Sequence, residues 1–234
     1  MSIRYKLTAL DGKVIAIDGP AGSGKSTTAR LLASQLGFVY LDTGAMYRAI
    51  TWFALRNGLP IDDGKLLETV ARKIKIEFEM DGDINRVYLN GADITEEIRT
   101  PEVTGAVSQV SAHPGVRKQM VKRQKEIGKK GNIVAEGRDT TSVVFPDADI
   151  KVYLDASIEE RARRRLLELS RKGIGTSLEE QIADLERRDQ FDSNREVSPL
   201  KKTRDSLVIN TTNLTIEEQV DRIIKLIKTK LTSL

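Results

Sequence analysis

The chain has 234 residues and a formal net charge of +4, from 38 lysines and arginines against 34 aspartates and glutamates. This length allows one hydrophobic core with an insertion, but is short for several domains. Hydrophobic residues make up 39% and charged residues 31%, which excludes a disordered or fibrous chain. The small basic excess does not predict nucleic-acid binding, because a surface that attracts a small anionic substrate would account for it equally well.

Cysteine is absent, which rules out disulfides and cysteine-ligated metals. The first residues lack the apolar run of a signal peptide, and the sequence has no run of about 18 apolar residues that could span a bilayer. We therefore expect a cytoplasmic protein, monomeric, with neither a membrane nor a nucleic acid as a partner.

Short β-rich segments alternate with longer amphipathic ones, which is typical of a parallel sheet with crossover helices. Capping-box spacing marks helix starts at three serine or threonine residues, each followed three positions later by glutamate. The sequence thus predicts a single α/β domain over residues 1–234, with about five parallel strands flanked by helices. The predicted strands are Val14–Asp18, Phe38–Leu41, Ile133–Glu136, Ile150–Leu154 and Leu207–Asn210, and the capping boxes are Ser157 with Glu160, Ser177 with Glu180, and Thr215 with Glu218.

A different pattern appears between residues 57 and 101. Polar and apolar residues alternate over Ile74–Met80 and Arg86–Leu89, on both sides of Asp81-Gly82-Asp83. This alternation predicts an antiparallel hairpin in an inserted subdomain. Helices are expected next, over Glu102–Ala112 and Val116–Gly128.

A phosphate-binding motif follows the first strand. The segment from Gly19 to Ser26 matches G-x-x-x-x-G-K-[ST], and a helix is expected directly after it, over Thr27–Leu36. Its backbone N–H groups would hold ATP phosphates, with Lys25 supplying charge and the Ser26 hydroxyl binding Mg²⁺. The motif predicts a P-loop NTPase-type sheet with these ATP-binding residues: Gly19, Pro20, Ala21, Gly22, Ser23, Gly24, Lys25, Ser26 and Thr27.

Charged residues cluster where two further strands end. Arg48 lies on the helix expected after the second strand, and Glu136-Gly137-Arg138-Asp139 lies at the carboxyl end of a later one. Open parallel sheets bind their ligands at this edge. Either Glu136 or Asp18 is the carboxylate expected to reach Mg²⁺ through water, and the sequence leaves both open.

These motifs together resemble those of bacterial cytidylate kinases. The resemblance covers nearly the whole chain and rests on the P-loop, Asp42–Arg48, Ser108-Gln109-Val110 with Arg117, Glu136–Asp139 and Asp192–Arg195, in this order. It implies transfer of a phosphoryl group from ATP to CMP or dCMP, with Mg²⁺. It also implies an inserted monophosphate-binding subdomain near residues 60–105 and an arginine-rich lid near residues 160–175.

The resemblance also implies a role for each site residue. Catalysis would depend on Lys25, Arg138 and Arg195, with Arg161 and Arg164 as the candidate lid arginines. The acceptor phosphate would be clamped by Arg48, Arg138 and Arg195, the base read by Ser108, Arg117 and Asp139, the sugar met by Arg188 and Asp192, and the pocket wall completed by Thr43 and Tyr47.

Substrate chemistry is consistent with these roles. Cytosine offers an amino donor beside two acceptors, which complements a carboxylate paired with a cation. The alternatives are a kinase for another small acceptor, such as AMP, UMP, shikimate or dephospho-coenzyme A, and a P-loop ATPase or nucleic-acid-binding protein.

Overall fold

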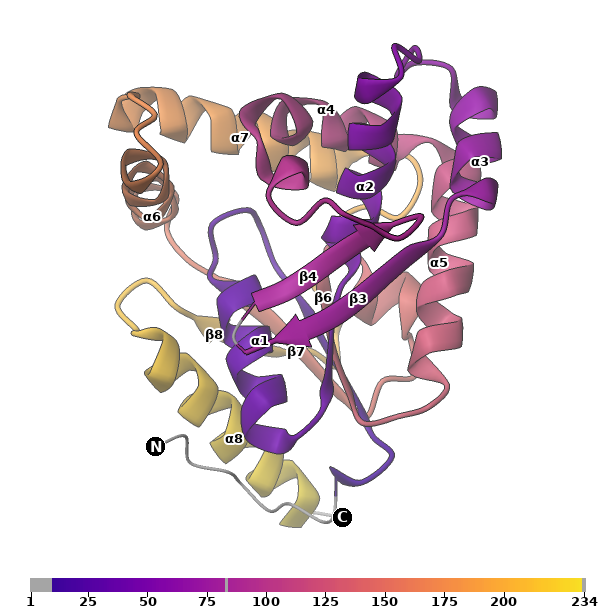
Figure 1. Ribbon diagram of the computed structural model, residues 1–234. Coiled ribbons are helices and arrows are strands. Elements are labelled where there is room, and N and C mark those ends of the chain that lie inside the picture. Colours follow the sequence, from indigo (N-terminus) through magenta and orange to yellow (C-terminus); the bar gives the residue numbers. More distant parts are fainter. Residues whose placement is uncertain (1–9, 83, 233–234) are drawn as a thin grey trace. The chain divides into compact units, whose positions relative to one another are not determined.

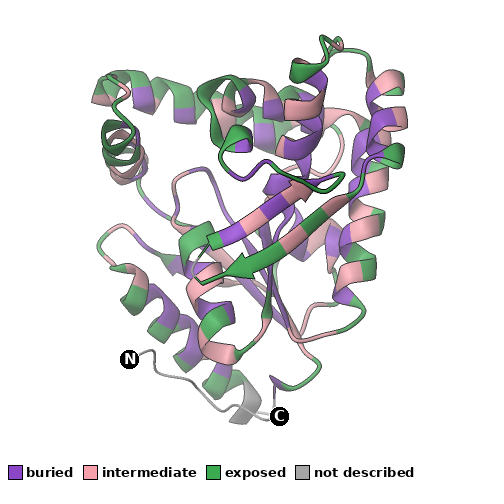
Figure 2. Ribbon diagram, viewed as in Figure 1, coloured by how far each residue is buried: buried purple, intermediate pink, exposed green. Residues whose placement is uncertain are grey.

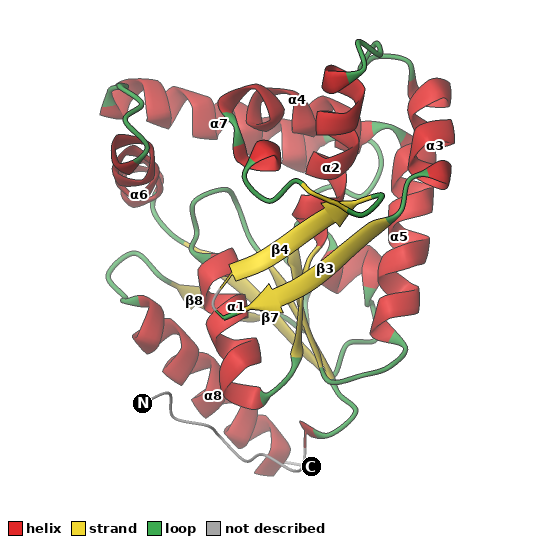
Figure 3. Cartoon of the chain, viewed as in Figure 1, coloured by secondary structure: helices red, strands yellow, loops and turns green. Residues whose placement is uncertain are grey.

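The computed structural model describes residues 10–82 and 84–232, which form two compact units. The first unit comprises residues up to Leu41 and from Lys130 onward, and the second comprises Asp42–Lys129. The elements of both are labelled in Figure 1 and coloured by type in Figure 3.

A five-stranded sheet forms the centre of the first unit, with the strand order β2-β6-β1-β7-β8. Strand β1 pairs in parallel with β6 and β7, and β7 pairs in parallel with β8. This confirms the predicted α/β fold with a parallel sheet. The strands are β1 (Val14–Asp18), β2 (Val39–Asp42), β6 (Ile133–Gly137), β7 (Ile150–Asp155) and β8 (Leu207–Asn210).

Strand β2 begins one residue later than predicted. The N–H of Phe38 bonds back to the Ala33 carbonyl at 2.9 Å, and the ladder starts at Val39, whose N–H reaches the Asn132 carbonyl at 2.8 Å. Phe38 therefore belongs to the helix-ending turn. Helix α1 (Lys25–Leu36) in turn begins earlier than expected, because Gly24 takes a left-handed conformation (φ 90°) at its N-cap.

Helices α1 and α8 (Ile216–Thr232) pack together beside the sheet. Their buried residues and the sheet's inner residues form one apolar core, visible as purple segments in Figure 2. Burial of this core supplies the main driving force for folding the unit. Its fully buried members include Ile15, Ile17, Leu32, Val152, Ile223 and Ile227.

Two more helices of the first unit, α6 (Ile158–Arg171) and α7 (Leu178–Asn194), pack against each other. The predicted capping boxes at Ser177 and at Thr215 are confirmed, since both reciprocal hydrogen bonds are present in each. At Ser157 the prediction is only half right. Its side chain caps the Glu160 N–H, but its own N–H donates to Thr212, and the Glu160 carboxylate turns to Arg164 instead.

The second unit combines helices with a separate three-stranded antiparallel sheet in the order β3-β4-β5. This confirms the predicted hairpin. The helices predicted over Glu102–Ala112 and Val116–Gly128 begin at Pro101 and Pro114 instead. Proline fits the first turn of a helix, because its missing N–H would have no partner there. The elements are α2 (Thr43–Arg56), α3 (Gly64–Lys73), β3 (Ile76–Asp81), β4 (Ile84–Leu89), β5 (Ala92–Asp93), η2 (Glu97–Arg99), α4 (Pro101–Ala112) and α5 (Pro114–Gly128).

Candidate active site

The P-loop connects β1 to α1 at the carboxyl edge of the five-stranded sheet. Gly19 passes so close to β7 that a Cβ on it would lie 2.1 Å from the Leu154 carbonyl oxygen. Any side chain at this position would push the loop off the sheet edge. The glycine therefore allows the loop to start flush against the central strands, with its N–H groups next to the positive end of α1.

Lys25 is 6% exposed, and its ammonium group donates to the Pro20 carbonyl at 3.0 Å, inside the same loop. Burial, followed by repulsion from Arg138, lowers the pKa of Lys25 to about 7, and attraction to Glu136 opposes that shift. A buried ammonium group with few compensating anions favours a negatively charged ligand.

The two carboxylates considered for Mg²⁺ have different surroundings. Glu136 accepts a hydrogen bond from the Ser26 hydroxyl at 2.7 Å and one from Tyr40 at 3.4 Å. Asp18, which is fully buried, instead accepts hydrogen bonds from Thr140 and Thr141. Glu136 is thus the carboxylate beside the P-loop serine.

Four of the predicted substrate residues form one charged network in the first unit. Arg138 donates to Asp192 at 2.9 Å, Arg195 lies 3.9 Å from Asp192, and Arg195 also lies 4.0 Å from Asp139. Burial favours the neutral form of Asp192, but Arg138, Arg188 and Arg195 outweigh it and hold its pKa below the ordinary value. Residues from the turn after β6 and from α7 and its C-terminal cap are thereby brought together.

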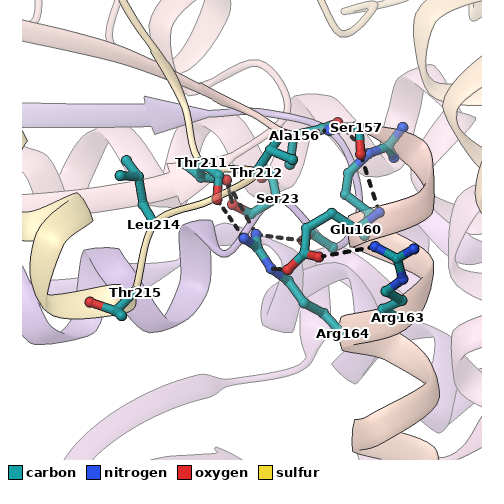
Figure 4. Close-up of polar contacts among 12 residues, drawn as sticks. Ser23, Ala156, Ser157, Glu160, Arg163, Arg164, Thr211, Thr212, Leu214 and Thr215 are labelled. Atoms are coloured by element: carbon teal, nitrogen blue, oxygen red, sulfur yellow. Dashed lines mark hydrogen bonds and ion pairs between the residues drawn. The ribbon is translucent and has the colours of Figure 1, made fainter.

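Figure 4 shows the polar contacts of Arg164 on α6. Arg164 donates to Glu160 at 2.9 Å and to the hydroxyl of Thr211 at 3.2 Å, and it also bonds the Thr211 carbonyl. Arg161 is 7% exposed and bonds the Ala21 carbonyl of the P-loop at 3.1 Å. Both side chains therefore contact the P-loop of their own unit, and Arg164 also contacts the turn after β8.

The remaining predicted residues lie in the second unit. Arg117, on α5, is 2% exposed, donates to the Ser111 carbonyl at 3.0 Å and stacks over the Tyr47 ring at 5.2 Å from its centroid. Arg48, on α2, donates to Thr104 of α4 at 3.0 Å. Thr43 is buried at the start of α2, and Ser108 lies half-buried on α4.

Sequence reasoning missed Asp189 and Thr211. Asp189, on α7, forms an ion pair with Arg161 and accepts a weak bond from the Ala21 N–H at 3.4 Å. Thr211 donates to the Ser23 carbonyl at 2.9 Å, directly after β8. The strand-end rule that identified Glu136–Asp139 would have found Thr211 if applied to the last strand.

Among residues 10–82 and 84–232, no cluster of three or more His, Cys, Asp or Glu side chains is placed to hold a metal ion. Within the same ranges, no helix is both long and apolar enough to cross a membrane.

A glycine-rich loop between a parallel strand and a helix, a buried lysine within it, and a serine–carboxylate pair at its end define a P-loop nucleotide-binding protein. Comparison with known proteins narrows this class. The family model for cytidylate kinase matches residues 15–229. The chain belongs to the cytidylate kinase family.

Curated relatives agree with this family assignment, and a solved structure shares the fold. Cytidylate kinases of Bacillus cereus (strain ATCC 10987 / NRS 248) and Bacillus thuringiensis (strain Al Hakam) are each 49% identical over 213 residues, covering 91% of this chain and 95% of theirs. A crystal structure of an uncharacterized protein from Eubacterium ventriosum shares only the fold, with a TM-score of 0.51 and 16% identity over 92% of this chain and 98% of that one.

Proposed function

We propose that the chain transfers the γ-phosphoryl group of ATP directly, in line, to CMP or dCMP, giving ADP and CDP or dCDP. The observation that carries the proposal is the pairing of Ser26 with Glu136 at 2.7 Å, next to the Arg138–Asp192 pair at 2.9 Å. A proposed donor-site residue, Glu136, is thus on β6, and a proposed acceptor-site residue, Arg138, directly follows the same strand. Membership of the cytidylate kinase family supports the choice of acceptor.

On the donor side, the P-loop N–H groups and Lys25 bind the phosphates of ATP. Ser26 and Glu136 offer a hydroxyl and a carboxylate, which are the hard oxygen donors that Mg²⁺ prefers, so the residues present fit this ion. When bound, Mg²⁺ would offset negative charge on the β- and γ-phosphates. Arg161 and Arg164 extend from α6 toward the same loops and add positive charge around the transferred group.

On the acceptor side, no protein base is needed. A phosphate monoester has a second pKa of about 6 and is mostly dianionic at neutral pH, so its oxygen can attack directly. Arg138, Arg195 and Arg48 are the proposed bidentate donors for this phosphate. The residues proposed for the ribose and the surrounding wall are Arg188, Asp192, Thr43 and Tyr47.

Asp139, Arg117 and Ser108 are the proposed readers of the base. A carboxylate accepts from the N4 amino group of cytosine but would face the O4 acceptor of uracil. A mispaired buried polar group costs about 1–3 kcal/mol, so UMP should be a poorer acceptor by roughly one to two orders of magnitude.

Residues 60–105 are the proposed monophosphate-binding subdomain, and residues 160–175 the proposed lid that excludes water. Most of the proposed lid belongs to the arginine-bearing helix α6. A cytoplasmic location and a monomeric state stay predictions.

A coupled assay of ADP release tests the function. Wild-type protein with ATP·Mg²⁺ should turn over strongly with CMP and dCMP, weakly with UMP, AMP and GMP, and least with water alone. A Lys25→Met variant is the matched control for contaminating kinases, because it removes the P-loop charge while keeping a long side chain. Preference for another monophosphate would refute the proposed base readers, and equal ADP release without any acceptor would identify an ATPase instead.

A further inference from the structure

We propose that Asp18 is a positioning residue for the acceptor site: its carboxylate holds the turn that carries Arg138 and Asp139. The inference rests on the function proposed above, in which these two residues contact the acceptor. Asp18 is the last residue of β1 and lies directly before the P-loop. Its side chain is bonded to Thr140 and Thr141, whereas Ser26 is bonded to Glu136.

The Asp18 carboxylate accepts four hydrogen bonds from two successive threonines. One oxygen receives the Thr140 N–H at 2.9 Å and the Thr140 hydroxyl at 2.6 Å. The other receives the Thr141 N–H at 2.7 Å and the Thr141 hydroxyl at 2.6 Å. Both threonines are buried and begin the short π-helical turn η3 (Thr140–Val144).

Burying a carboxylate costs desolvation free energy, so this arrangement is an unfavourable way to stabilise a fold. Asp18 is 0% exposed, and within the described part of the chain no arginine, lysine or histidine forms an ion pair with it. Burial raises the pKa of Asp18, and the threonine hydrogen bonds oppose that shift. Apolar side chains would fill the same space without the desolvation cost of a charge. We infer that the carboxylate is present because it holds the turn after β6 in the geometry that acceptor binding requires.

Asp18 holds the backbone on both sides of Arg138 and Asp139. Gly137 is paired with Asp18 across the β1–β6 ladder, and Thr140 and Thr141 are bound by the Asp18 side chain. The backbone of Arg138 and Asp139 is therefore fixed at both ends by the same residue. Because catalytic contacts lose strength over displacements of about 1 Å, a clamp at this point controls acceptor binding.

The clamp can be tested by changing Thr141 rather than Asp18, because Asp18 lies directly before the P-loop. Thr141→Val removes one hydroxyl donor to Asp18 and keeps the side-chain shape, whereas the matched control Thr141→Ser keeps the hydroxyl. We expect Thr141→Val and Asp18→Asn each to raise the KM for CMP by at least about tenfold and to reduce the preference for CMP over UMP. The KM for ATP of Thr141→Val should stay within about twofold of wild type, and Thr141→Ser should behave like wild type.

Two results would overturn the clamp. One is a lower melting temperature in Thr141→Val with an unchanged KM for CMP, which would make the contact structural only. The other is a parallel rise of both KM values. Combining Thr141→Val with Asp18→Asn should add little to the larger single effect, because both remove the same contact.

Asp139→Asn separates this failure from a failure of the proposed function. If Asp139→Asn weakens CMP use and Thr141→Val does not, the base reader stands and the clamp is wrong. If Asp139→Asn leaves CMP use unchanged and Thr141→Val raises the KM for CMP, the base reader is wrong and the clamp acts through Arg138. If both variants leave CMP use unchanged, the base reader and the clamp are both wrong.

Discussion

Binding of ATP·Mg²⁺ at pH 8 should draw almost one proton from solution onto Lys25. The side chain is 6% exposed, and burial, with repulsion from Arg138, lowers its pKa to about 7 in the protein without nucleotide. Triphosphate oxygens beside the ammonium group favour its charged form. Nucleotide binding therefore raises the pKa of Lys25 back toward the ordinary lysine value.

The size of the effect follows from the pKa of about 7. One pH unit above its pKa, a group is protonated in roughly one molecule in eleven, so about 0.9 of a proton is taken up at pH 8 if the bound form is fully charged. At pH 6 the lysine is already about nine-tenths protonated, and the uptake at Lys25 falls to about 0.1 of a proton. The sign is uptake on binding, and it fades as the pH decreases.

Isothermal titration calorimetry measures this number directly. At one pH, the observed binding enthalpy varies linearly with the ionisation enthalpy of the buffer, and the slope is the number of protons exchanged. Lys25→Arg is the matched control, since it keeps a cation that does not titrate near neutral pH. A slope near zero for wild type at pH 8, or an equal slope for Lys25→Arg, would refute the reasoning.

Three further predictions address other contacts. Glu136→Gln should raise the Mg²⁺ concentration needed for half-maximal activity by about tenfold or more, measured by titrating Mg²⁺ at fixed ATP; an unchanged requirement would remove Glu136 from the metal site. Asp192→Asn should lower the free energy of unfolding at pH 7 by about 2–4 kcal/mol, because it leaves Arg138 buried with a weaker partner. The pKa of Asp192 is depressed, so its contribution is present above the ordinary aspartate pKa and lost only as the pH falls through the depressed value. In urea denaturation, the difference in free energy of unfolding between wild type and Asp192→Asn should therefore stay constant from pH 8 to pH 5. A difference that shrinks within this interval would contradict the depressed pKa of Asp192. Arg48→Lys should raise the KM for CMP by about tenfold without affecting the KM for ATP, since lysine cannot replace a bidentate guanidinium. Steady-state kinetics with each substrate varied in turn tests this, and equal changes in both KM values would contradict it.

Local signals in the sequence were sufficient for most elements. The P-loop lies within one strand–loop–helix segment, so its residues are contiguous and its identity did not depend on distant contacts. The hairpin over β3 and β4 was likewise predictable, because period-2 alternation on both sides of a turn is a short-range pattern. Errors occurred at element ends, as at Phe38, where a hydrogen bond to the preceding helix displaced the first ladder bond.

Contiguous motifs and their order were enough to predict the fold class, the P-loop and the family. Which of the two candidate carboxylates lies beside the P-loop serine became visible only in the tertiary structure. Strand order places β6 next to β1, which brings Glu136 to Ser26 across 110 residues of chain and Thr140 to Asp18 across 122. Parallel pairing joins strands far apart in sequence, and no local periodicity records which side chain at a strand end meets which partner.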